Sequence, residues 1–178
     1  GKKIMAQKNN AIGNLTASVF RDEMKGRFSG QLLHTPKADQ YWVYKTHSVP
    51  ETPAPIFVTT DEFMANERTG DSVAVDDKVI YLVIKHTGYL TSSKTSTTRE
   101  GIMLNYSGAD PLFDGNDGAD TNSIFISPKE LFIVKLNGVL VEDLQVGTCV
   151  LDSNGLPSAL GIDTVYAEIA AIIEDITA

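Results

Sequence analysis

The side chains best suited to chemistry in this sequence are three histidines and one cysteine: His34, His47, His86 and Cys149. No two histidines stand four residues apart, the spacing that places two metal ligands on one helix face. The sequence also has no Gly-x-Ser-x-Gly nucleophile elbow and no Walker-type phosphate loop. A single cysteine cannot form a disulfide within the chain. We therefore expect structural or solvated histidines, a small half-buried thiol, no cofactor and no enzymatic activity.

The stretch from Asp110 to Asp120 gathers carboxylates and an amide, which are the oxygen ligands that calcium prefers. Counted from Asp114, however, the fifth position is Gly118 and the twelfth is not glutamate, so the stretch departs from the EF-hand pattern. We expect an exposed acidic turn and no metal site, with a bound ion as the alternative.

The overall charge argues against nucleic acid as a partner. The net charge is −8, and a surface of this sign repels phosphate. The first residues are basic by contrast, and the cations there that are candidates for partner contact are Lys2, Lys3, Lys8 and Arg21. We expect this basic segment either to lie on an acidic neighbouring protein or to be solvated.

No apolar run approaches the ~20 residues that cross a bilayer, so we expect no membrane association. Polar residues follow Lys2 and Lys3 where a signal peptide would have its apolar core, which predicts synthesis in the cytoplasm.

Aromatic residues cluster at Tyr41, Trp42 and Tyr44, around the single tryptophan of the chain. The cluster predicts a short strand whose rings belong to the core, or alternatively an anchor that faces a partner. These three residues complete the set of candidate contact residues.

The longest unbroken apolar run, Val79 to Ile84, is rich in β-branched residues and predicts a strand that is buried on both faces. Further short apolar runs are separated by turn-forming residues, and Asn137-Gly138 predicts a hairpin turn. This pattern predicts an all-β protein, built as an antiparallel β-sandwich or a small β-barrel.

Residues 1–50 have little sustained periodicity and are punctuated by glycine and proline, so we expect a long, largely irregular N-terminal arm. Residues 51–178 are expected to form the β domain. The segment 163–176 fits both helical and strand spacing; its alanines favour a helix, but we favour a strand that closes the sheet.

The run Thr69-Gly70-Asp71-Ser72, then Val75-Asp76-Asp77-Lys78-Val79, then Leu82 to Gly88 is followed by a hydroxyl-rich loop and a Gly/Asp loop. This order, over roughly residues 69–176, resembles that of tailed-bacteriophage virion structural proteins. The resemblance does not extend to residues 1–50.

The resemblance implies a capsid decoration, or cement, protein on the outer capsid surface of the virion. It implies a homo-oligomer, with a trimer favoured, that contacts the major capsid protein through its arm. A phage tail, fibre or baseplate component is one alternative. A carbohydrate-binding β-sandwich, with Tyr41, Trp42 and Tyr44 stacked on sugar rings, is the other.

Overall fold

The long apolar run forms a strand, as predicted, and the whole fold is β-structured around it. The computed structural model describes residues 11–21, 24–57, 73–105 and 123–176. Within these residues the single helical element is a 3-10 turn, η1 (Val141–Asp143). The all-β prediction is therefore confirmed.

The strands are β1 (Ala11–Arg21), β2 (Met24–His34), β3 (Gln40–Val49), β4 (Ala54–Pro55), β5 (Lys78–Tyr89), β6 (Gly101–Asn105), β7 (Ile124–Ile126), β8 (Leu131–Leu140), β9 (Gln145–Leu151), β10 (Pro157–Leu160) and β11 (Val165–Glu174).

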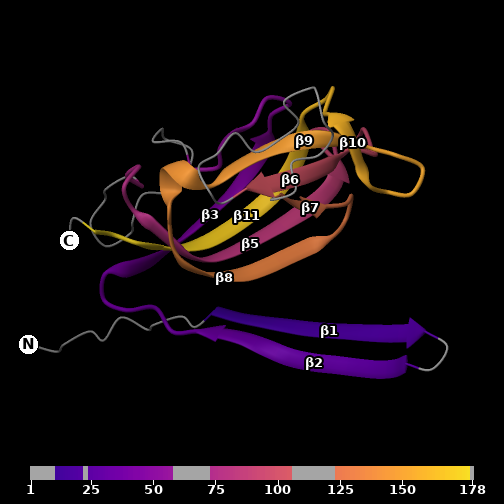
Figure 1. The fold of residues 1–178 in the computed structure, drawn as a ribbon. Helices are drawn as coiled ribbons and strands as arrows, with labels where there is room; N and C mark the ends of the chain where they lie inside the picture. Colours follow the sequence, from indigo (N-terminus) through magenta and orange to yellow (C-terminus); the bar gives the residue numbers. More distant parts are fainter. Residues whose placement is uncertain (1–10, 22–23, 58–72, 106–122, 177–178) are drawn as a thin grey trace, which may run out of the picture.

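Two antiparallel sheets stack face to face and enclose the core (Figure 1). The first has the strand order β3-β11-β5-β8. The second has the order β9-β6-β7, and β4 and β10 both pair with β9. The two sheets remain open, so the sandwich is confirmed over the barrel.

The chain crosses from one sheet to the other at each step from β3 to β9, except between β6 and β7. The resulting sheets, β3-β11-β5-β8 and β4-β9-β6-β7, have the strand arrangement of a jelly roll. Strand β10 is an addition to it, between β9 and β11. A jelly roll spreads its connections over the ends of the sandwich and leaves the outer sheet faces free of connections.

Strand β5 is buried on both faces, as its unbroken apolar run predicts. Leu82 and Ile84 point into the core between the sheets, whereas Tyr81 and Val83 belong to a separate apolar cluster on the opposite face. That second cluster includes residues of the hairpin formed by β1 and β2. The hairpin is thus a third layer beneath the first sheet (Figure 1).

The ambiguous C-terminal segment is a strand. β11 lies between β3 and β5 and pairs with both along most of its length. Its alanines, which favour a helix in isolation, allow the sheet to pack closely, because Ala167 and Ala171 are fully buried in the core. Tertiary pairing on both edges therefore outweighs local helix propensity.

The expectation of a largely irregular arm is wrong for residues 11–49. β1 and β2 pair in continuous register from Ala11 opposite His34 to Arg21 opposite Met24, and β3 is an edge strand of the sandwich. The hairpin escaped prediction although polar residues alternate with apolar residues or glycine over residues 13–19 and 24–32, because the glycines and alanine in these segments weaken the hydrophobic signal.

The predicted hairpin turn at Asn137-Gly138 is also wrong. Both residues lie within β8, which continues to Leu140. Val139 pairs with Val79, whereas Lys135 pairs with Tyr81, so β8 bulges between these pairs. Gly138 has φ +70° and allows the bulge without breaking the strand.

Candidate protein-contact surface

The histidines and the cysteine are spread over the sandwich. The Nε2 atom of His34 lies 2.8 Å from the side-chain oxygen of Gln40, and the Nε2 atom of His86 lies 2.8 Å from the backbone carbonyl oxygen of Glu100. Cys149 is fully buried, and this burial raises the pKa of its thiol to about 11. A protonated buried thiol is a poor nucleophile. In the part of the chain that the structure describes, no group of histidine, cysteine and acidic side chains is arranged to hold a metal.

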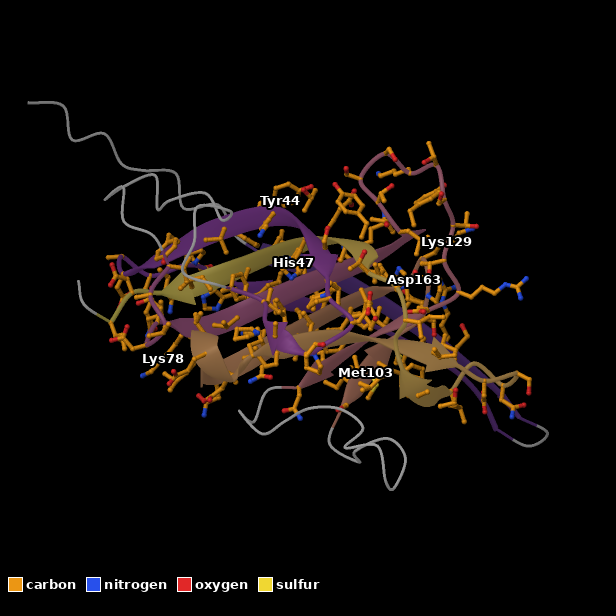
Figure 2. All side chains as sticks on the ribbon, turned by 90° about the horizontal axis from the view of Figure 1, so that it is seen from above. Tyr44, His47, Lys78, Met103, Lys129 and Asp163 are labelled. Carbon is orange, nitrogen blue, oxygen red and sulfur yellow. The ribbon has the colours of Figure 1, made fainter. Side chains whose placement is uncertain are left out.

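His47 lies on β3, as Tyr44 does (Figure 2), but it is nearly buried. Among the residues that the structure describes, neither of its ring nitrogens has a hydrogen-bond partner. Burial, together with the charge of Lys45, lowers the pKa of His47 to about 4 from the usual 6.5. The ring is therefore neutral at pH 7, and it acts as a buried side chain of the sandwich.

The most distinctive surface is the β1–β2 hairpin, whose base is docked on the outer face of the first sheet. Ala11 is buried, Leu32 is half-buried, and both belong to one apolar cluster with residues of that sheet. The sheet residues in this cluster are Tyr81, Val83, Ile133 and Ile172.

Polar contacts fix the base of the hairpin in place. The Tyr81 hydroxyl donates to the carbonyl oxygen of Leu32 at 3.4 Å, and the Lys135 ammonium donates to that of Leu33 at 2.9 Å. Gln40, which bonds to His34, also donates to Glu174 at 2.8 Å. The hairpin is thus attached to β5, β8 and β11.

The docked face of the hairpin continues beyond the part that packs on the first sheet. Residues opposite one another in an antiparallel pair share a face, so Leu15, Ala17 and Phe28 follow Ala11 and Leu32 on the same side. All three are exposed, and Phe28 is 65% exposed. We call these three residues the distal hairpin face.

The opposite side of the hairpin is mostly polar but carries one apolar pair at its base. Ile12 and Leu33 stand directly opposite each other and point away from the body, and Leu33 is 53% exposed. Sequence reasoning missed these residues and the distal hairpin face. The available signal was the alternation of polar residues with apolar residues or glycine over residues 13–19 and 24–32, on either side of Asp22-Glu23.

The three predicted aromatic contact residues do not share a face. Tyr41 points inward, and its hydroxyl donates to Asp77 at 3.2 Å. Trp42 and Tyr44 lie on the outer face of the first sheet and are 37% and 54% exposed. We call Trp42 and Tyr44 the outer aromatic pair.

Of the four basic residues predicted to contact a partner, only one lies in the described part of the chain. Arg21 is the last residue of β1. Lys2, Lys3 and Lys8, like the acidic stretch Asp110–Asp120, lie outside the described residues. Residues 1–34 contain six of the 15 Lys and Arg residues but only two of the 23 acidic ones. The segment that contains the hairpin is therefore basic, and the remainder of the chain is strongly acidic.

A second feature lies at the end of the sandwich, where an open hollow of about 330 Å³ is lined in part by Glu100, Val150 and Ile162. The carboxylate of Glu100 is nearly buried and accepts hydrogen bonds from the backbone N–H groups of Ile162 and Asp163. This use of its oxygens makes Glu100 a structural support for the connection between β10 and β11.

Comparison with protein families and with curated protein sequences finds no match. Two solved structures of the Tobacco streak virus coat protein are similar. The C2 crystal form is 11% identical, with a TM-score of 0.40, over 79% of this chain and 88% of that chain. The coat protein dimer is 10% identical, with a TM-score of 0.41, over 80% of this chain and 90% of that chain. Similarity at this level carries no assignment of function.

The described residues contain no helix that is long and apolar enough to cross a membrane. The fold and its surface together define a class: an all-β jelly-roll protein that carries an apolar hairpin outside its core.

Proposed function

We propose that this protein is a structural component of a virus particle that acts through protein–protein contacts. The observation that carries the proposal is the β1–β2 hairpin, which exposes apolar side chains on both faces outside a jelly-roll body. Jelly rolls build many viral capsids, although the fold alone does not fix a function.

Exposed apolar side chains on both faces of a two-stranded ribbon require a physical explanation. An isolated hairpin is marginally stable in water, and only the base of this one is supported by its own body. Contiguous exposed apolar surface typically marks a protein interface. A subunit of an assembly would cover this surface with its neighbours.

Within this class, the jelly-roll arrangement favours a shell subunit that packs against copies of itself. The sequence resemblance over residues 69–176 favours instead a decoration protein that contacts the major capsid protein, as a trimer on the outer capsid surface. Both roles use the same hairpin, and they differ in whether the chain closes a shell alone.

A carbohydrate-binding module is a second candidate, because the outer aromatic pair is exposed and jelly rolls also occur in lectins. Tyr41 cannot join this pair as a third stacking ring, since it faces the core. A sugar ring stacked on Trp42 would change the fluorescence of the single tryptophan.

The experiment is to purify the chain and follow its state by sedimentation velocity and electron microscopy over increasing protein concentration. Closed particles formed by the chain alone would support a shell subunit. Small oligomers that bind to preformed capsids would support a decoration protein.

A chain that stays monomeric at high concentration and binds to no capsid would contradict the proposal. If such a monomer changed its Trp42 fluorescence on addition of oligosaccharides, the carbohydrate-binding role would replace it. Replacement of Tyr44 by serine should then abolish the fluorescence change.

A further inference from the structure

We propose that the distal hairpin face docks on the outer aromatic pair of a second copy of this chain. The inference rests on the proposed function, since it names the partner through which the protein assembles.

Continuity with an existing interface is the first reason. The base of the hairpin face is already packed on the outer face of the first sheet, where Ala11 and Leu32 meet Tyr81. Leu15 and Phe28 continue the same face past its packed base, where the side chains are exposed. The base of this hairpin face packs on the outer sheet face of its own chain. The distal hairpin face, which continues it, is therefore suited to the outer sheet face of a second copy.

The acceptor surface is the uncovered part of that same sheet face. Trp42 meets Tyr81, which lies beneath the hairpin, with ring centroids 6.2 Å apart. The outer aromatic pair therefore lies next to the part of the sheet that the hairpin of the same chain covers. Its apolar rings offer a second copy the same kind of surface.

Charge complementarity between the two parts of the chain favours another copy over a basic partner. The hairpin lies in the basic segment, and Arg27 is exposed on the side of the hairpin opposite to Phe28. The acceptor surface lies on the acidic remainder of the chain. Glu168 and Glu174 share its face, but Glu168 pairs with Lys94 at 3.4 Å and Glu174 accepts from Gln40, so the complementarity is between the basic segment and the acidic body as a whole. Two bodies of the same negative sign repel each other, and a basic hairpin between them reduces this repulsion.

The contact is heterologous, because the hairpin of one copy meets the sheet of the next. Such a contact repeats from copy to copy and closes into a ring when the rotation allows it. It leaves Ile12 and Leu33, on the other side of the hairpin, available to a further neighbour.

The test begins with two variants of the full chain. Leu15→Ser with Phe28→Ser alters the distal hairpin face, and Tyr44→Ser alters the acceptor. The matched control is Thr16→Ala with Ser29→Ala, a directly opposed exposed pair on the other side of the same hairpin. We expect both surface variants to raise the dissociation constant of self-association at least about tenfold and the control to leave it unchanged.

Cross-linking tests the contact directly. A mixture of Phe28→Cys and Tyr44→Cys chains should form a disulfide-linked dimer on mild oxidation, since native Cys149 is fully buried. A mixture of Ser29→Cys and Tyr44→Cys chains should not. Association should also weaken as ionic strength rises, because salt screens the attraction between the basic segment of one copy and the acidic remainder of the next.

The two proposals fail in different ways. Self-association that is undiminished in both surface variants, with equal cross-linking from positions 28 and 29, would overturn this inference and leave the assembly function in place. A wild-type chain that does not self-associate at any concentration would overturn this inference and the role as a shell subunit together.

Discussion

The indole of Trp42 meets the ring of Tyr81 edge-on, with an angle of 68° between the two planes. Tyr81 is buried beneath the hairpin, whereas Trp42 is partly exposed beside it. Edge-to-face pairs contribute about 0.5–1.5 kcal/mol beyond their burial. The pair therefore joins the covered and uncovered parts of one sheet face, and the position of the hairpin decides how much of that face is free.

Replacement of Gly13 by alanine should loosen the hairpin. A Cβ atom at this position would lie 2.7 Å from the Tyr81 hydroxyl oxygen and 3.1 Å from a methyl carbon of Ile133. Overpacking of this kind costs about 1–3 kcal/mol. We expect faster hydrogen exchange of the β1 and β2 amides and faster proteolysis of the hairpin.

Gly30 provides the matched control for this substitution. It lies in the same hairpin, opposite Leu15, and a Cβ atom there would meet nothing within 4 Å. Gly30→Ala should keep the exchange rates of the wild type. Equal loosening by both substitutions would show that the contact between Gly13 and Tyr81 does not hold the hairpin.

His47 should make the protein less stable in acid. Its pKa is about 4 in the folded state and about 6.5 when unfolded, so the unfolded chain binds the proton more tightly. The stability linked to His47 is complete above pH 6.5 and is lost as the pH falls towards 4. We expect a loss of at most about 3 kcal/mol from this residue, measured by urea unfolding over this range.

His47→Leu should remove this part of the pH dependence, because leucine fills a similar volume and does not titrate. Ser48→Ala, at the neighbouring exposed position, should keep the slope of the wild type. If wild type and His47→Leu lose stability in parallel between pH 6.5 and 4, the pKa of His47 is the same in the folded and unfolded states, which would contradict the lowered value.

The sandwich itself could be predicted from the sequence, because its strands carry the signals of burial. Val79 to Ile84 is apolar without a break, and the structure buries both of its faces. The strand order could not be predicted, since β11 reaches β3 and β5 through pairings that no local pattern records. The Asn137-Gly138 pair could not be interpreted from local sequence either. It predicts a turn, but it forms a bulge within β8 because β5 pairs with β8 on both sides of it.

The candidate contact surface was only partly predictable. The aromatic cluster was predicted as one group of contact residues. Because side chains alternate along a strand, Tyr41 points into the core and Trp42 lies at the surface, so the three residues do not form one contact site. Leu15 and Phe28 went unrecognised because their period-2 neighbours are mostly glycine and alanine, which give a weak hydrophobic signal. Such residues become visible only when the pairing of β1 with β2 places them on one face.

Leu82 tests the core of the sandwich. It is fully buried on the inner face of β5, and Leu82→Ala should lower the free energy of unfolding by about 2–5 kcal/mol through lost burial and a cavity. Lys85→Ala, at an exposed position of the same strand, should change it by less than about 0.5 kcal/mol. Urea denaturation measures both, and a near-neutral Leu82→Ala would contradict the burial of this face.

Glu100 should hold the connection between β10 and β11 in place. Its carboxylate accepts from the N–H of Ile162 at 3.0 Å and from that of Asp163 at 3.3 Å, and Glu100→Ala leaves both donors without this partner. The loss should cost about 1–3 kcal/mol and speed hydrogen exchange at these two amides. Glu142→Ala, at an exposed position, is the control and should change neither. Unchanged protection of Ile162 and Asp163 in Glu100→Ala would mean that the carbonyl oxygen of Asp163, which accepts from the Thr148 hydroxyl at 2.9 Å, is enough to hold the connection.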